Sequence, residues 1–417
     1  MTSSALQRRL GLGDAVFIGL GSMIGAGVFA VWAPAADAAG TGLLIGLAIA
    51  AVVAFGNATS SAQLAAAYPT SGGTYAYGRA ELGPWWGFVA GWGFVIGKTA
   101  SCAAMALTFA AYAAPAGWER PVAIAGVVVL TAVNWFGVTR TAGAARVIVV
   151  ISVGALAAAV TAAFSAGADP RWLTADTLWA GGGYGILQSA GLLFFAFAGY
   201  ARIATMGEEV RDPRRVIPRA IVIAFAVALA VYAVVAVAVL SALGPDAVAS
   251  STEPVADAAA KSGWAWIDVV VRIGAAAASL GALLALIAGV SRTAFAMSRE
   301  DDLPRFLDAV HPRWHVPHRA ELSAAVIVVL LVALVDLRGA IGFSSFGVLL
   351  YYFVANVAAF RQRGDARRYP VALQIIGGIG CLVLAVTLPW QSVAAGVVVV
   401  AIGVAYRAVR LRRAAPR

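Results

Sequence analysis

Residues 21–29 read Gly-Ser-Met-Ile-Gly-Ala-Gly-Val-Phe and lie in the middle of a charge-free apolar run from Ala15 to Ala36. An apolar run of this length spans a bilayer as a helix. Each glycine costs a helix roughly 1 kcal/mol and leaves the backbone unshielded, so three glycines at mid-depth predict a local break. In lipid, such a break survives only inside protein or beside a cavity. Amides freed there favour a small anionic group such as a carboxylate, whereas the alternative is that the glycines only let helices pack closely.

The composition indicates the class of protein. Hydrophobic residues make up 61% of the chain, charged residues make up 12%, and the mean hydropathy is +0.86. A soluble domain carries roughly twice this fraction of charge, so the sequence predicts an all-α polytopic membrane protein. The first apolar run is too long for a signal peptide, and we expect it to remain as a mature span. Cys102 and Cys381 lie in separate apolar segments and are expected to be buried thiols.

Hydropathy, with glycine, proline and charge clusters as punctuation, divides the chain into about twelve expected spans. They cover residues 13–35, 41–66, 84–113, 121–138, 145–165, 184–206, 218–243, 264–296, 319–336, 339–360, 371–388 and 391–408. The segments between them are short, so the chain 1–417 is expected to form a single membrane domain.

The distribution of basic residues predicts the orientation. If the N-terminus is cytoplasmic, the inside segments carry 22 of the 30 Arg and Lys residues, the outside segments carry four, and four fall within spans. Cytoplasmic loops are enriched in Arg and Lys, so both termini are expected in the cytoplasm. The net charge of +10 is then explained by basic loops that are attracted to anionic membrane lipid. No nucleic-acid partner is expected, because the arginines form no continuous stripe on the sequence.

A second broken span is expected five spans after the first. Residues 191–202 read Gly-Leu-Leu-Phe-Phe-Ala-Phe-Ala-Gly-Tyr-Ala-Arg, again with glycine at mid-depth. Matching interruptions in two halves are typical of inverted-repeat transporters, which bind their substrate near the membrane midplane. The expected first repeat covers 13–165 and the second covers 184–360, with two peripheral helices in 371–408.

Four motifs carry a resemblance to a known family. They are Gly-Ser-Met-Ile-Gly-Ala-Gly-Val-Phe (21–29), Tyr-Pro-Thr-Ser-Gly-Gly-Thr-Tyr (68–75), Gly-Glu-Glu-Val-Arg-Asp-Pro (207–213) with Pro-Arg-Ala (218–220), and Ser-Arg (291–292) followed by Ala-Met-Ser-Arg-Glu-Asp-Asp-Leu-Pro (296–304). In order and spacing, over essentially the whole chain, they resemble bacterial amino acid permeases of the amino acid, polyamine and organocation transporter superfamily. The resemblance implies a 5+5 inverted-repeat fold, alternating access, and an amino acid bound between discontinuous spans one and six.

The resemblance also implies the site residues. The substrate carboxylate would be held by the amides of Ile24, Gly25, Ala26 and Gly27, and the ammonium by the carbonyls of Ser22, Met23, Phe195, Ala196 and Ala198. Both assignments agree with the half-helix dipoles. The residues Phe194, Phe195, Phe197 and Tyr200, around Gly199, would supply an aromatic wall or gate, although Phe194 is better explained by packing alone.

Two departures from the family pattern bear on the substrate. Many relatives carry an acidic residue shortly after the glycine of span six, where this chain has Ala201 and Arg202, and a Glu where Gln63 stands here. A cationic side chain would need a carboxylate partner in this setting. We therefore favour a neutral, apolar amino acid, with a cationic amino acid or polyamine antiporter as the alternative.

The coupling residues are less clear in the sequence. Span five contains no ionisable residue, and Ser152 is its most polar candidate. Lys98 is the sole lysine within a span, which makes it a candidate for proton coupling or substrate contact, with structural pairing as the alternative. Ser279 is a further candidate for an ion or substrate site. Arg202 is expected to pair with Glu208 or Glu209, with contact to an acidic substrate as the alternative, and Arg272 is expected to pair with Asp268.

Other functional classes fit the residues less well. An enzyme would need convergent catalytic groups, yet His311, His315 and His318 lie in one loop without metal-ligand partners, so no metal or cofactor is expected. A receptor that binds an amino acid on the same fold without transporting it remains an alternative. The expected location is the bacterial cytoplasmic membrane, and the expected coupling is to protons or to exchange.

Overall fold

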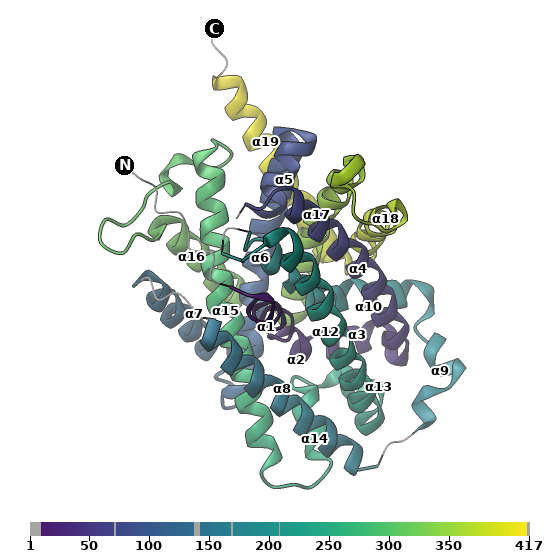
Figure 1. The fold of residues 1–417 in the computed structure, drawn as a ribbon. Coiled ribbons are helices and arrows are strands. Elements are labelled where there is room, and N and C mark those ends of the chain that lie inside the picture. The colour runs from purple at the N-terminus through teal and green to yellow at the C-terminus, as the bar shows by residue number, and fades with distance from the viewer. Residues whose placement is uncertain (1–9, 71, 137–141, 168–169, 208, 415–417) are drawn as a thin grey trace.

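The computed structural model describes residues 10–70, 72–136, 142–167, 170–207 and 209–414, which form a bundle of helices (Figure 1). Within these ranges the only β pairing is an isolated bridge between Leu10 and Val210. Ser71 of the second motif and Glu208 lie outside the described residues. The all-α class expected from the composition is confirmed.

Twelve helical segments of the described chain correspond to the twelve expected spans. They are α1 with α2 and α3 (Leu12–Met23, Gly27–Ala30, Trp32–Ala39), α4 (Leu43–Ala67), α6 (Pro84–Ala113), α7 (Glu119–Trp135), α8 (Ala142–Ser165), α10 with α11 (Gly182–Phe197, Ala201–Ala204), α12 (Pro213–Leu243), α15 (Ile267–Arg299), α16 (His318–Leu334), α17 (Leu337–Arg361), α18 (Val371–Thr387) and α19 (Trp390–Ala414). Nine stretches in the described part are long and apolar enough to cross a membrane. The helices α7, α16 and α18 have 17 residues each, the lower limit for a span.

Short helices occupy several of the connections between spans. They are α5 (Gly73–Leu82), α9 (Ala175–Trp179), α13 (Pro245–Ser250) and α14 (Pro254–Ala260). Both α13 and α14 begin with proline, whose fixed φ and missing amide suit the first helical position. Hydropathy does not reveal these helices because they are short and carry polar residues.

Spans one and six are interrupted where the glycines predict a break. The helix α1 ends at Met23, and the chain resumes helical geometry at Gly27. In the sixth span, α10 ends at Phe197, and one turn of 3₁₀-helix from Ala198 to Tyr200 leads into α11. The expectation that these two spans are discontinuous is confirmed.

The helices pack in matching pairs. If each span of the first five is matched to the span five places later, α6 corresponds to α15, and α8 to α17. The helix α6 packs along α17, and α15 packs along α8. Likewise, α4 packs on α10, and α12 packs on α1. If each helix is replaced by its counterpart in the other half, the contact of α6 with α17 becomes that of α15 with α8, and the contact of α4 with α10 becomes that of α12 with α1. Such equivalent contacts are expected in a transporter with internal repeats.

Candidate functional site

The backbones of the two broken spans touch at glycines. A Cβ atom at Gly199 would lie 2.2 Å from the carbonyl oxygen of Ser22 and 2.6 Å from the amide nitrogen of Met23. A Cβ atom at Gly27 would lie 2.8 Å from the Cα of Ala196. Only glycine allows an approach this close. These positions hold the two breaks against each other, so that their polar backbone groups share one buried region.

Consecutive amides at the break in span one lack a backbone partner. Among the described residues, the amides of Gly25, Ala26, Gly27 and Val28 have no hydrogen-bond acceptor. Ile24 differs from the expectation, since its amide donates to Leu20 at 2.6 Å and so completes α1. All of these residues are buried. The free donors therefore start one residue later than expected.

The carbonyl groups at the breaks are bridged by a tyrosine. The hydroxyl of Tyr232 on α12 lies 2.6 Å from the carbonyl oxygen of Met23 and 2.9 Å from that of Ala196. The carbonyl of Phe195 accepts the amide of Ala198. Of the five carbonyls expected to face an ammonium group, these three already accept hydrogen bonds from the chain itself.

The fourth carbonyl accepts a hydrogen bond from the lysine within span three. The ammonium of Lys98 donates to the carbonyl oxygen of Ala198 at 3.2 Å, and the hydroxyl of Tyr352 on α17 donates to the same oxygen at 3.2 Å. The Lys98 side chain is buried and forms no ion pair with a described carboxylate. The structure thus brings Lys98 to the break in span six.

Small residues place Lys98 and Tyr352 beside the break. Gly97 on α6 packs directly on Gly347 of α17, since a Cβ on either would lie within 3.0 Å of the opposite backbone. One turn away, the hydroxyls of Ser101 and Ser344 are 2.6 Å apart. Small side chains at an interface let two membrane helices approach closely, and this contact directs α6 and α17 toward the same carbonyl.

Aromatic rings surround the breaks. Phe197 packs edge-on against Tyr232 with ring centroids 5.0 Å apart, and Phe194 packs edge-on against Tyr352 at 5.8 Å. Tyr200 also lies against Tyr352, at 5.0 Å. All five rings are buried. The packing expected for Phe194 is present, and the remaining rings give the region an apolar wall.

The other candidate residues fall into different settings. The Ser152 hydroxyl donates to Ile148 of its own helix at 2.7 Å, a bond typical of serine in an apolar helix. The Ser279 hydroxyl is buried and has no hydrogen-bond partner among the described residues. Ser279 lies on α15, whose Ala282 would be 2.9 Å from a Cβ at Gly25. Ser279 is therefore close to the break in span one.

Two arginines within spans have different partners. Arg272 pairs with Asp268 at 2.8 Å, as expected, and also with Glu253 at 2.7 Å. Burial raises the pKa of the Glu253 carboxyl, although the hydrogen bond from Arg272 opposes this effect. In the described chain Arg202 forms no ion pair with Glu209 and contacts the Thr205 hydroxyl at 3.5 Å, whereas Glu208, the other expected partner, lies outside the described residues.

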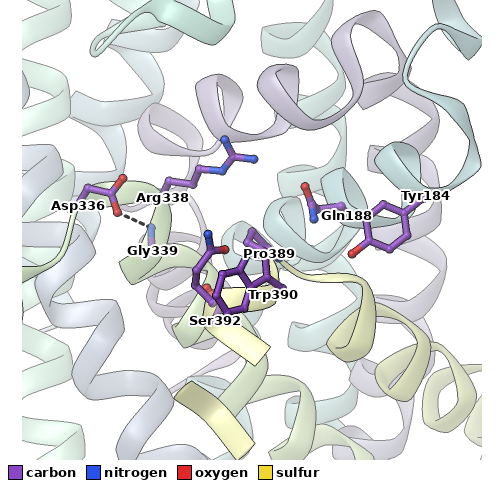
Figure 2. Close-up of a pocket in the computed structure, with 9 residues that line it drawn as sticks. Tyr184, Gln188, Asp336, Arg338, Gly339, Pro389, Trp390 and Ser392 are labelled. Atoms are coloured by element: carbon purple, nitrogen blue, oxygen red, sulfur yellow. Dashed lines mark hydrogen bonds between the residues drawn. The ribbon is translucent and has the colours of Figure 1, made fainter. Parts of the chain in front are cut away.

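A surface cavity of about 510 Å³ lies away from the breaks (Figure 2). Its lining includes Tyr184, Asp336, Arg338 and Trp390, from the ends of α10, α17 and α19. Arg338 pairs with Asp37 on α3. The cavity therefore joins connecting segments and contains none of the residues expected to bind the substrate.

Tyr232 and Tyr352 are the residues near the breaks that the sequence analysis missed. They contact carbonyls that lie between 36 and 209 residues away in the chain. One signal was present, because Tyr232 is the sole tyrosine in the apolar span 213–243. A buried hydroxyl needs a hydrogen-bond partner, and in lipid the partner must come from the protein.

Known proteins resemble this chain over most of its length. A family model described as amino acid permease matches residues 10–409. An uncharacterized transporter of Mycobacterium tuberculosis (strain ATCC 25618 / H37Rv) is 59% identical over 409 residues, which cover 97% of this chain and 92% of the relative. The branched-chain amino acid permease BcaP of Bacillus subtilis (strain 168) is 25% identical over 93% of this chain and 90% of its own length. Cationic amino acid transporter 4 of Homo sapiens is 27% identical over 85% of this chain and 59% of its own length.

Proposed function

The chain belongs to the amino acid permease family of the amino acid, polyamine and organocation superfamily, and on this premise we propose that it carries a neutral, apolar amino acid across the membrane by alternating access. The observation that supports this most is the pair of breaks, which place free amides opposite backbone carbonyls in one buried region. A zwitterionic amino acid presents the complementary pair of charges.

In this proposal the carboxylate binds at the break in span one. In the described part of the chain, the amides of Gly25, Ala26, Gly27 and Val28 have no protein acceptor to displace. Hydrogen bonds from several amides to one carboxylate are charge-assisted and stronger than neutral ones. The Ser279 hydroxyl, buried without a partner beside this break, is a further donor for the same carboxylate.

The ammonium binds at the break in span six, where Lys98 now stands. The Lys98 ammonium has the charge and donor geometry of an amino acid ammonium, and it already occupies the Ala198 carbonyl. A substrate ammonium at this oxygen therefore competes with Lys98. If Lys98 loses its proton, its amine donates only a weaker, neutral hydrogen bond, which a charged substrate ammonium can displace, so substrate binding depends on the charge of Lys98. Amino acid exchange without a coupled proton is the alternative.

A neutral side chain fits the surroundings of the breaks. The buried carboxylates of the described residues are Asp302, which follows α15, and Glu321, at the start of α16. The helix α16 packs on α6, α7 and α15 and not on either broken span. Without a buried carboxylate near the breaks among the residues that the structure describes, a cationic side chain would be left unpaired at high cost. The relatives include a branched-chain permease and cationic transporters, so they support either class.

The proposed transporter consists of two repeats, residues 13–165 and 184–360, and two peripheral helices in residues 371–408. The reciprocal packing of α6 on α17 and α15 on α8 supports this division. The excess of basic residues on one side supports a cytoplasmic location for both termini, and the bacterial relatives support the cytoplasmic membrane.

Uptake by purified protein in liposomes tests the proposal. A panel of labelled amino acids that includes leucine, isoleucine, valine, alanine, arginine and lysine should show saturable uptake of a neutral member. Uptake of arginine or lysine alone would support the cationic alternative instead. Thermal stabilisation by a neutral amino acid without any uptake or exchange would identify a receptor.

A further inference from the structure

A second cavity, of about 440 Å³, lies at the connection between α17 and α18. Its lining residues are Phe360, Arg361, Arg363, Arg367 and Val371. Three arginine residues therefore line one small space, and none of its lining residues is acidic. Within the described residues, none of the three arginines forms an ion pair.

The backbone around this cavity is held in place by buried amides. Gln362, between the two exposed residues Arg361 and Arg363, is buried and accepts a hydrogen bond from Gln63 of α4 at 3.1 Å. The side-chain oxygen of Gln63 in turn accepts the backbone amides of Arg368 and Tyr369, at 3.0 and 3.2 Å. The segment is thus anchored on both sides of the cavity, and Arg361, Arg363 and Arg367 are exposed on this fixed backbone.

The surroundings are apolar on the membrane side. Phe360 is 48% exposed, and α18, which begins at Val371, exposes Ile375, Ile376 and Ile379 at 46%, 42% and 59%. Exposed isoleucines along an apolar helix face lipid tails in a membrane protein. A cluster of cations at the end of such a face lies at headgroup depth.

We propose that this cavity binds the phosphate of an anionic phospholipid in the leaflet that contacts the α17–α18 connection. Guanidinium groups bind phosphate oxygens through paired, charge-assisted hydrogen bonds. The lipid, rather than free phosphate, is the expected source because its acyl chains cover the exposed side chains of α18.

A purely structural role explains one of the arginines and not the other two. Arg367 donates to the Phe360 carbonyl at 3.1 Å, so it satisfies an acceptor in the last turn of α17. Arg361 and Arg363 have no such protein contact in the described chain. Within the described chain the side chains of these two arginines are therefore available to a ligand at the cavity.

The double variant Arg361→Gln/Arg363→Gln tests the site and leaves Arg367 in place to complete α17. Native mass spectrometry of the purified full-length chain would follow titrations with phosphatidylglycerol, phosphatidylcholine and inorganic phosphate. We expect phosphatidylglycerol to bind the wild type, and the double variant to bind it roughly thirtyfold more weakly, because two sets of charge-assisted hydrogen bonds to the phosphate are lost.

The control is Arg319→Gln/Arg412→Gln, which removes the same charge from exposed arginines outside the cavity. We expect this control to weaken phosphatidylglycerol binding by less than threefold. Equal weakening by the two double variants would overturn the proposal, because binding would then depend on overall charge. Equal occupancy by phosphatidylcholine, or by inorganic phosphate alone, would also contradict an anionic-lipid site.

Discussion

Gly199 lies where the backbone of span six meets that of span one. Its neighbours Ser22 and Met23 are at the end of α1, and any side chain at position 199 would overlap them. The contact is between backbones, so rotamer changes cannot relieve it. Gly199 therefore fixes the distance between the amides and the carbonyls that the proposed substrate would join.

Replacing this glycine by alanine should abolish transport. In Gly199→Ala the new methyl group would lie 2.2 Å from the Ser22 carbonyl oxygen, and separating the breaks costs about 1–3 kcal/mol of stability. We expect at least a tenfold loss of amino acid uptake in liposomes. The control is Gly154→Ala on α8, where a Cβ meets nothing within 4 Å and no loss is expected. Wild-type uptake by Gly199→Ala would contradict the site.

Lys98 offers a test of coupling. If it exchanges a proton during transport, Lys98→Ala should remove the pH dependence of uptake, and Lys98→Arg should fail because guanidinium does not release its proton in proteins. The chain has one other lysine, the exposed Lys261, and Lys261→Arg serves as the control. The measurement is uptake or exchange in liposomes across a series of pH values. A wild-type pH profile in Lys98→Arg would leave Lys98 with a structural role alone.

Tyr232 joins the two breaks through one hydroxyl. In Tyr232→Phe the carbonyls of Met23 and Ala196 lose their donor, so we expect a loss of about 2 kcal/mol in the free energy of unfolding. Tyr184→Phe removes a hydroxyl from a ring that is 61% exposed and should be neutral. Denaturant unfolding of both variants in detergent makes the comparison. Equal stability of the two variants would show that the bridge does not stabilise the breaks.

At the level of single residues, the sequence predicted the backbone of the breaks better than the side chains around them. Three glycines within seven residues predict a break from local conformational cost alone, and the free amides follow at Gly25 to Gly27. Ile24 was expected among the free donors, but its amide completes α1, and the sequence alone does not reveal where that last turn ends. Tyr232 and Tyr352 were missed because their roles arise only when α12 and α17 fold against distant spans.

The helix α19 is joined to the rest of the bundle by a buried ion cluster. Arg407 of α19 pairs with Asp302, which also accepts Arg79 of α5 at 3.0 Å and the Tyr75 hydroxyl at 2.8 Å. The Asp302 side chain is 3% exposed, and that of Arg407 is 6% exposed. One carboxylate thus links α5, the end of α15 and α19.

Neutralising this carboxylate should be costly. Asp302→Asn leaves Arg407 buried without a counter-ion, for which about 3–5 kcal/mol of destabilisation is expected. The neighbouring Asp301 provides a matched control. The Asp301 side chain pairs with Arg305 and Arg410 and is 52% exposed. Asp301→Asn should therefore lower the free energy of unfolding by about 1 kcal/mol or less. A small effect of Asp302→Asn in denaturant unfolding would mean that α19 is held mainly by apolar packing.

Among the helices, the long spans were predictable and the short ones were not. The expected span 84–113 coincides with α6, and 371–388 differs from α18 by one residue. Membrane hydropathy is a property of about twenty residues and so locates these spans well. The helix α5 has ten residues and includes Arg79 and Glu81, so its identity depends on contacts with α6 and α17 that the sequence does not display.

Across the whole molecule, the reciprocal packing of the two halves extends beyond what the sequence could predict. Position and glycine content suggested that spans one and six correspond, but no sequence similarity linked the halves. The pairs α4 with α10 and α1 with α12 add contacts that an exchange of halves interconverts. Interfaces between helices depend on which small residues contact each other. These contacts cannot be predicted from the sequence of one helix, because they depend on the position of its partner.

Orientation in the membrane is the whole-molecule property that most needs a measurement. The described chain offers a low background for cysteine labelling, because Cys102 and Cys381 are both buried. Asp176→Cys in α9 and Asp308→Cys after α15 introduce thiols at exposed positions. With both termini in the cytoplasm, Asp176→Cys should react with an impermeant thiol reagent added to intact cells, whereas Asp308→Cys should react only after the cells are opened. The distribution of arginines predicts this pattern because basic loops are retained on the cytoplasmic side. The opposite pattern would invert the bundle, and the arginine cavity at the α17–α18 connection would then face the outer leaflet.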